Sequence, residues 1–118
     1  MHPILVRDSG ETFQGRQPVP PELFIEGEPT ADTWLSESFA EARGLKIGIW
    51  VGQPGAIRVP AYPSDELFTV LSGAIALEST DGTTLQVGPG ESCIVRKGWA
   101  GTWRTLAVTR KCYVVFNG

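Results

Sequence analysis

The chain has 118 residues, 42% of them hydrophobic and 19% charged, which fits one globular domain with a single core and excludes a disordered chain. Its formal net charge is −3, and its basic residues are not gathered into patches. Nucleic acid and anionic membrane surfaces are therefore excluded as expected partners, because both require clustered Lys and Arg side chains.

The first 30 residues are rich in proline. They hold five of the nine prolines of the chain, which excludes a continuous helix or a central strand. We expect an extended N-terminal arm over residues 1–30, followed by one barrel domain over residues 31–118. The apolar run Leu23-Phe24-Ile25 should pack along its own barrel or against a neighbouring subunit, while residues 1–20 fit a loosely ordered tail almost equally well.

The remaining chain favours strands. Leu35, Phe39 and Ala42 fit one face of a helix, so the pattern between residues 34 and 42 is ambiguous by itself. After Gly44, short apolar and β-branched runs alternate with turns such as Asp81-Gly82, which favours an all-β jelly roll over an α/β fold. The eight predicted strands cover residues 46–51, 56–59, 67–71, 74–78, 83–87, 92–95, 102–107 and 111–116.

Two blocks of sequence have the spacing of a known family. In residues 55–73, six residues separate Glu66 from the turn glycine Gly73, and residues 88–103 end in Gly98-Trp99-Ala100-Gly101-Thr102-Trp103. These blocks resemble the two motifs of small single-domain cupins related to ureidoglycine aminohydrolase and to the ethanolamine-utilisation cupins. The resemblance covers roughly residues 31–118 and implies a cupin double-stranded β-helix, a jelly-roll barrel, with residues 34–42 irregular to strand. It implies no single function, because one barrel hosts many activities.

The resemblance also indicates where a metal ion would be held. Metal cupins use two histidines shortly before the glutamate, the glutamate itself and a histidine of the second motif. Here these histidine positions are occupied by Pro60 and Tyr62, or by Val59 and Ala61, and by Gly101. Since the only histidine is His2, and Glu66 alone supplies too few ligands for a catalytic zinc or iron, we expect no metal and no cofactor. A divalent ion held weakly by Glu66 and water is the alternative.

Strand alternation predicts which side chains line the barrel. If Glu66 points inward, Phe68 and Val70 do so too, whereas Leu67, Thr69 and Leu71 point outward and Asp65 lies on the surface. By the same parity Gly101, Trp103 and Thr105 face inward, and the Trp103 indole is expected to fill the space beside Gly101. For Trp50 the sequence leaves both faces open.

A carboxylate at Glu66 inside the barrel requires a cationic partner or a raised pKa, and Arg58 and Lys111 are the expected partners. Glu66 is then a candidate general acid or base, or half of an ion pair without catalytic function. The candidate ligand-binding residues are Trp50, Arg58, Tyr62, Phe68, Arg96, Trp103, Lys111 and Tyr113.

Three functions follow as hypotheses. The first is metal-independent binding of a small polar metabolite in the barrel cavity. The second is a catabolic enzyme of amino-acid, ureide or sugar metabolism that uses Glu66 for proton transfer. The third is an assembly or regulatory module that dimerises through its arm and an exposed sheet face, although a homodimer is compatible with all three. The sequence does not specify the ligand, the reaction or the pathway.

The expected location is the cytoplasm. No apolar run approaches the roughly 20 residues of a membrane-spanning helix, and the first residues lack the features of a signal peptide. Cys93 and Cys112 are too few for a disulfide framework, so we expect two reduced and buried thiols.

Overall fold

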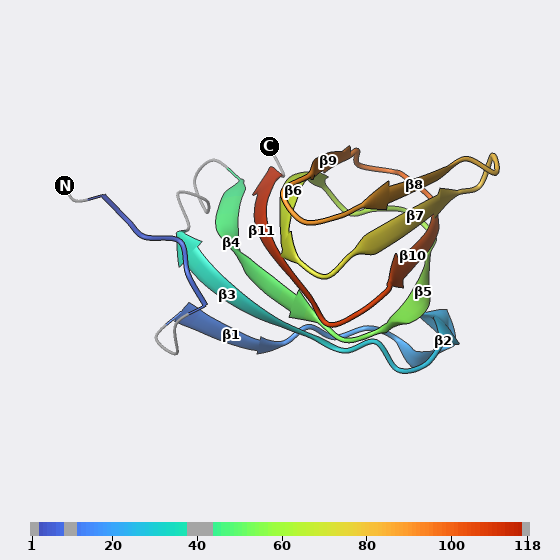
Figure 1. Ribbon diagram of the computed structural model, residues 1–118, viewed down its shortest axis with the longest axis horizontal. Coiled ribbons are helices and arrows are strands. Elements are labelled where there is room, and N and C mark those ends of the chain that lie inside the picture. The colour runs from blue at the N-terminus through green and yellow to red at the C-terminus, as the bar shows by residue number, and fades with distance from the viewer. Residues whose placement is uncertain (1–2, 9–11, 38–43, 117–118) are drawn as a thin grey trace.

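Two antiparallel sheets face each other and form a barrel (Figure 1). The computed structural model describes residues 3–8, 12–37 and 44–116, and within these ranges it contains eleven strands and one three-residue 3-10 helix, η2 (Pro21–Leu23). None of its helices is long and apolar enough to cross a membrane. The six-stranded sheet has the order β1 (Phe13–Arg16), β3 (Ala31–Glu37), β4 (Leu45–Gly52), β11 (Thr109–Phe116), β6 (Asp65–Ser72) and β9 (Ser92–Val95). The five-stranded sheet has the order β2 (Phe24–Glu26), β5 (Gly55–Val59), β10 (Gly101–Thr105), β7 (Ile75–Ser79) and β8 (Thr84–Val87).

The predicted all-β jelly roll is confirmed, and each of the eight predicted strands is present. The segment at 34–42 was left ambiguous by its pattern. Its first part belongs to β3, whereas residues 38–42 lie outside the described residues.

The proline-rich arm contributes edge strands to both sheets of its own barrel. β1 pairs with β3 at the edge of the six-stranded sheet, and β2 pairs with β5 at the edge of the five-stranded sheet. Leu23 and Phe24 are partly buried, while Ile25 remains 50% exposed. The boundary between arm and barrel at residue 30 stays a prediction.

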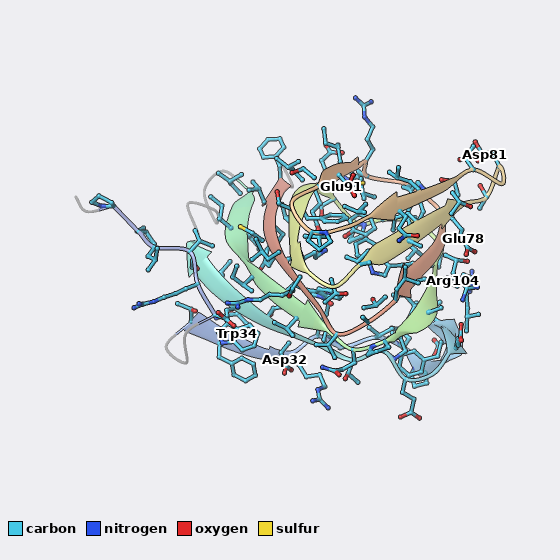
Figure 2. The ribbon with its side chains drawn as sticks, in the orientation of Figure 1. Asp32, Trp34, Glu78, Asp81, Glu91 and Arg104 are labelled. Carbon is cyan, nitrogen blue, oxygen red and sulfur yellow. The ribbon has the colours of Figure 1, made fainter. Side chains whose placement is uncertain are left out.

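An ion-pair network on the outer face of the five-stranded sheet holds β2 in place. The Arg104 guanidinium of β10 donates through Nε to Glu78 of β7 and through Nη1 to Glu26 of β2, each at 2.7 Å. Figure 2 shows Glu78 and Arg104 together at the edge of the molecule, away from the barrel interior. The arm is therefore tied to the sheet by side chains as well as by its backbone.

Strand alternation is confirmed along β6. Glu66, Phe68 and Val70 are buried, whereas Leu67 and Leu71 are exposed. The inward prediction also holds in β10, where Trp103 and Thr105 are buried. The buried core consists of Val59, Phe68, Val70, Ile75, Leu77, Val87, Cys93, Val95 and Trp103.

One packing prediction was wrong. A side chain added at Gly101 would clash with the Glu78 carbonyl oxygen of β7 and would lie 2.7 Å from the Trp99 ring, so the β7 backbone and Trp99, and not Trp103, fill this space. Trp103 instead lies two residues further along β10, opposite Ile57 and Leu77.

The two cysteines lie on opposite faces of the six-stranded sheet. Cys93 is buried in the core opposite Phe68, which faces inward, and Cys112 is paired with Thr69, which faces outward. Both thiols are free, and burial raises the pKa of each thiol.

Candidate functional site

A cavity of about 600 Å³ opens between the two sheets. Its walls come from the inner face of β4 and β11, from β5, from the loop of residues 60–64 and from arm residues 17–20. This volume is in the range of small-molecule sites. Glu66 supplies the carboxylate of this cavity.

Both oxygens of the Glu66 carboxylate accept a hydrogen bond from a cavity side chain. The Lys111 Nζ donates to Oε2 at 2.6 Å, and the Tyr62 hydroxyl donates to Oε1 at 2.7 Å. Only 5% of the Lys111 side chain and 8% of the Glu66 side chain are exposed. Of the two partners predicted for Glu66, the structure therefore selects Lys111.

The Tyr62 hydroxyl is held in its neutral, donating form. Burial raises its pKa well above the ordinary tyrosine value, and the Glu66 carboxylate raises it further by its charge and by accepting the hydrogen bond. Tyr113, another residue of the cavity wall, has a pKa that is raised by burial and by the charge of Glu66.

Strand register explains how Lys111 meets Glu66. Lys111 pairs with Trp50 of β4 and Val70 of β6, whereas Glu66 pairs with Val115, four positions further along β11. The two long side chains reach toward each other across Phe68, whose ring centroid is 4.6 Å from the Lys111 Nζ. The ammonium also lies 4.9 Å from the Trp50 ring and 4.5 Å from the Trp103 ring. Such distances are favourable for cation–π attraction.

An aromatic wall continues from this ammonium into the cavity. Tyr62 stacks on Trp103 with ring centroids 6.0 Å apart and an interplanar angle of 9°. Trp50 meets Trp103 edge to face at 6.2 Å, so its side chain points into the barrel, which the sequence had left open. The Trp103 Nε1 is buried and finds no acceptor in the described parts of the chain.

The loop that carries Tyr62 is fixed to a neighbouring turn. The Tyr62 amide donates to the Trp99 carbonyl at 2.7 Å, and the Gly98 amide donates to the Tyr62 carbonyl at 2.8 Å. The Lys97 amide donates to the Asp65 carboxylate at 2.9 Å, on the exposed surface as predicted for Asp65. Tyr62 is thus presented to Glu66 by a loop with its own backbone hydrogen bonds.

Two predicted ligand-binding residues do not lie where we expected them. Arg58 is exposed and lies opposite Thr102, with a backbone parity that turns it away from the barrel, so it only borders the cavity and does not pair with Glu66. Arg96 is also exposed and borders a separate, smaller hollow between β8 and β9. The other predicted residues are brought together around the cavity: Trp50, Tyr62, Glu66, Phe68, Trp103, Lys111 and Tyr113.

Sequence reasoning missed three residues of this region. Gln17 of the arm accepts a hydrogen bond from the Trp50 Nε1 at 3.1 Å. Trp99 packs beside Tyr62 and donates through Nε1 to Ser79 at 2.9 Å. Lys46 lines the cavity from β4. Lys46 and Trp50 share one face of β4, so the position of Lys46 follows once the register of β4 places Trp50 in the interior.

The donor set does not fit a catalytic metal ion. In the described residues there is no group of three or more His, Cys, Asp or Glu side chains that could hold one. The only histidine, His2, lies outside those residues. Both Glu66 oxygens already accept hydrogen bonds, one of them from an ammonium group that would repel a cation at close range.

Comparison with solved structures supports the same architecture. A protein of unknown function of the DUF861 family from Pseudomonas syringae aligns with a TM-score of 0.79 and 25% identity over 87% of this chain and 43% of its own. The present chain therefore spans less than half of that protein. The EutQ protein of Clostridium difficile aligns with a TM-score of 0.65 and 17% identity, over 85% of this chain and 80% of its own. A putative ethanolamine utilization protein Q from Salmonella typhimurium aligns with a TM-score of 0.62 and 17% identity, over 73% and 68%.

Sequence comparison assigns the family. No curated protein matches the chain. The model of the EutQ-like cupin domain matches residues 39–113, which include both predicted motifs and the Tyr62, Glu66 and Lys111 network. The chain belongs to the EutQ-like cupin family.

Proposed function

We propose that this chain is a metal-independent cupin that binds a small polar metabolite in the barrel cavity, in the cytoplasm. The observation that carries the proposal is the buried network of Tyr62, Glu66 and Lys111, which borders a cavity of about 600 Å³. Convergent polar groups in an aromatic pocket are the usual signature of a small-molecule site. The metal-independent part rests on the donor set, which offers too few ligands in the described residues.

A catalytic role for Glu66 has less support. A general base needs a free acceptor within hydrogen-bond reach of the proton that it removes. Both Glu66 oxygens are already engaged, by Tyr62 and by Lys111. A substrate proton would have to share one of these oxygens with the Tyr62 hydroxyl or the Lys111 ammonium, so binding is the simpler function for this geometry.

Dimerisation remains compatible with the binding function. Ile25 of the arm is 50% exposed, although its neighbours Leu23 and Phe24 pack on their own barrel. If the arm joins two subunits, Ile25→Glu should lower the oligomer mass measured by light scattering. An unchanged mass for this variant would argue against an arm-mediated dimer.

The test of the proposed function is a thermal-shift screen of metabolites, combined with the metal content of the purified protein. We expect a metabolite that raises the melting temperature of a protein without stoichiometric metal, and a different shift in Glu66→Gln, because this substitution leaves the Lys111 ammonium in the cavity without its charged partner. The matched control is Glu22→Gln, which makes the same change on an exposed residue that does not line the cavity. Stoichiometric metal, or a shift in Glu66→Gln identical to that of wild type, would contradict the proposal.

A further inference from the structure

The cavity has a charge opposite to that of the whole chain. The chain has ten basic and thirteen acidic residues. Among the residues that line the cavity, Lys46 and Lys111 lie on its inner wall and Arg58 lies at its border, against a single acid, Glu66. A cleft with an excess of one sign concentrates ligands of the other sign. The lining therefore favours an anionic ligand.

An amine ligand is disfavoured because its binding position is already filled. A carboxylate surrounded by aromatic faces is the arrangement that binds ammonium groups. Here the Lys111 Nζ takes that place, 2.6 Å from Glu66 and 4.5 to 4.9 Å from the rings of Trp50, Phe68 and Trp103. Tyr62 occupies the second carboxylate oxygen. Both Glu66 oxygens thus already accept a hydrogen bond, and the Lys111 ammonium beside them repels a ligand cation.

Lys46 supplies a cation that this internal pair does not neutralise. Its ammonium makes no ion pair with any side chain of the described residues, and the residue is exposed at the cavity wall. Lys46 pairs with Val115 of β11, and Val115 pairs with Glu66 of β6, so the three residues form one row on the inner face of the sheet. With strands about 4.8 Å apart, Lys46 lies on the order of 10 Å from the Glu66 strand. A metabolite in the cavity can span this distance.

We propose that the cavity binds a small organic anion, a carboxylate of metabolite size, with its charged group directed to Lys46 and its uncharged part against the aromatic wall of Trp50, Tyr62 and Trp103. This inference rests on the proposed function and adds the ligand class to it. It separates this chain from any amine-binding function that the names of its ethanolamine-utilisation neighbours suggest.

Isothermal titration with charge-matched probes tests the ligand class. The first set is glycolate, ethanolamine and ethylene glycol, and the second is succinate, 1,4-diaminobutane and 1,4-butanediol. We expect at least one carboxylate to bind more than about tenfold tighter than its matched amine or alcohol, with an affinity that falls as salt is added. Tighter binding of an amine or an alcohol would overturn the ligand class and leave the proposed function in place. No heat and no thermal shift with any probe or metabolite would count against both.

Two variants locate the anion. Lys46→Gln should weaken carboxylate binding by about two- to fivefold, whereas the control Lys97→Gln, an exposed lysine outside the cavity, should not. Lys111→Met should reverse the preference, because it exposes the Glu66 carboxylate and the aromatic faces to a ligand ammonium. If Lys111→Met does not fold, Lys46→Gln still decides the outcome. Equal carboxylate affinity in Lys46→Gln and wild type would overturn the assigned contact.

Discussion

Lys111 and Glu66 form a buried ion pair with an Nζ–Oε2 distance of 2.6 Å, although their residues lie in different rows of the sheet. The two charges compensate each other, so the pair adds no net charge to the barrel interior. Three aromatic rings and the Tyr62 hydroxyl complete its surroundings. Its energetic role follows from the cost of leaving either charge alone.

Breaking the pair on one side should destabilise the protein more than removing both partners. Lys111→Met leaves Glu66 buried without its cation, which costs about 3–5 kcal/mol, whereas replacing a whole buried pair is often neutral. We expect Glu66→Gln/Lys111→Met to recover at least half of the stability that Lys111→Met loses in urea unfolding. The exposed pair of Arg16 and Asp32, at 3.6 Å, is the control, and Arg16→Met should cost less than about 1 kcal/mol. Additive losses in the double variant would contradict this account.

Tyr62 should make stability fall at alkaline pH. Burial and the Glu66 carboxylate raise its pKa, so the native state keeps the hydroxyl proton where the unfolded chain, with a tyrosine pKa of about 10, releases it. This contribution to stability is complete below about pH 10 and is lost as the pH rises beyond that value.

Tyr62→Phe removes this titration. Its free energy of unfolding should decline less steeply above pH 10 than that of wild type, by up to about 1.4 kcal/mol per pH unit. At neutral pH the variant should be less stable by about 1.5–3 kcal/mol, because Glu66 loses a hydrogen bond. Urea unfolding at a series of pH values measures both effects. Identical pH slopes for variant and wild type would refute the role of Tyr62.

Arg104 should fix the arm strand β2 without contributing much to global stability. Its two ion pairs are partly exposed, with 32% of the Arg104 side chain and 70% of the Glu26 side chain accessible, so Arg104→Met should leave the free energy of global unfolding nearly unchanged. Amide hydrogen exchange in residues 24–26 should nevertheless accelerate, because β2 loses its side-chain link to β10. Arg16→Met, at the other edge of the barrel, should leave this exchange unchanged. Unaltered exchange in Arg104→Met would show that backbone pairing alone holds β2.

The side chains on the inner face of the barrel were predictable because alternate residues of a strand point to opposite faces of the sheet. The motif spacing marks Glu66, and the two-residue period of a strand then assigns Phe68 and Val70 to the interior. The sequence left both Arg58 and Lys111 open as the ion-pair partner of Glu66, although the alternation of side chains along β5 already argued against Arg58. Ile57 and Val59 are both on the inner side of β5, so Arg58 between them faces outward.

The alternation of side chains along a strand could not predict contacts between strands that are distant in the sequence. Trp50 could be assigned to the interior only with the register of β4 against β11, where it pairs with Lys111. The arm was recognised as extended from its prolines, but its pairing with both sheets depends on tertiary contacts such as the one between Arg104 and Glu26. Trp99 was missed because it lies in a turn, outside any strand period.

Gly73, the turn glycine of the first motif, should tolerate no side chain. Its φ is +84°, and an alanine Cβ would lie 2.6 Å from the Val108 carbonyl oxygen and against the Thr109 side chain. Thr109 is fully buried and accepts a hydrogen bond from the Ala74 amide, so it cannot move aside without losing this contact. Gly82 is the matched control, with a φ of +92° and no atom within 4 Å of its added Cβ. Gly82→Ala should cost about 1–2 kcal/mol from backbone strain alone, and Gly73→Ala should cost at least about 1 kcal/mol more in urea unfolding. Equal losses would mean that only backbone conformation, and not close packing, requires glycine at this turn.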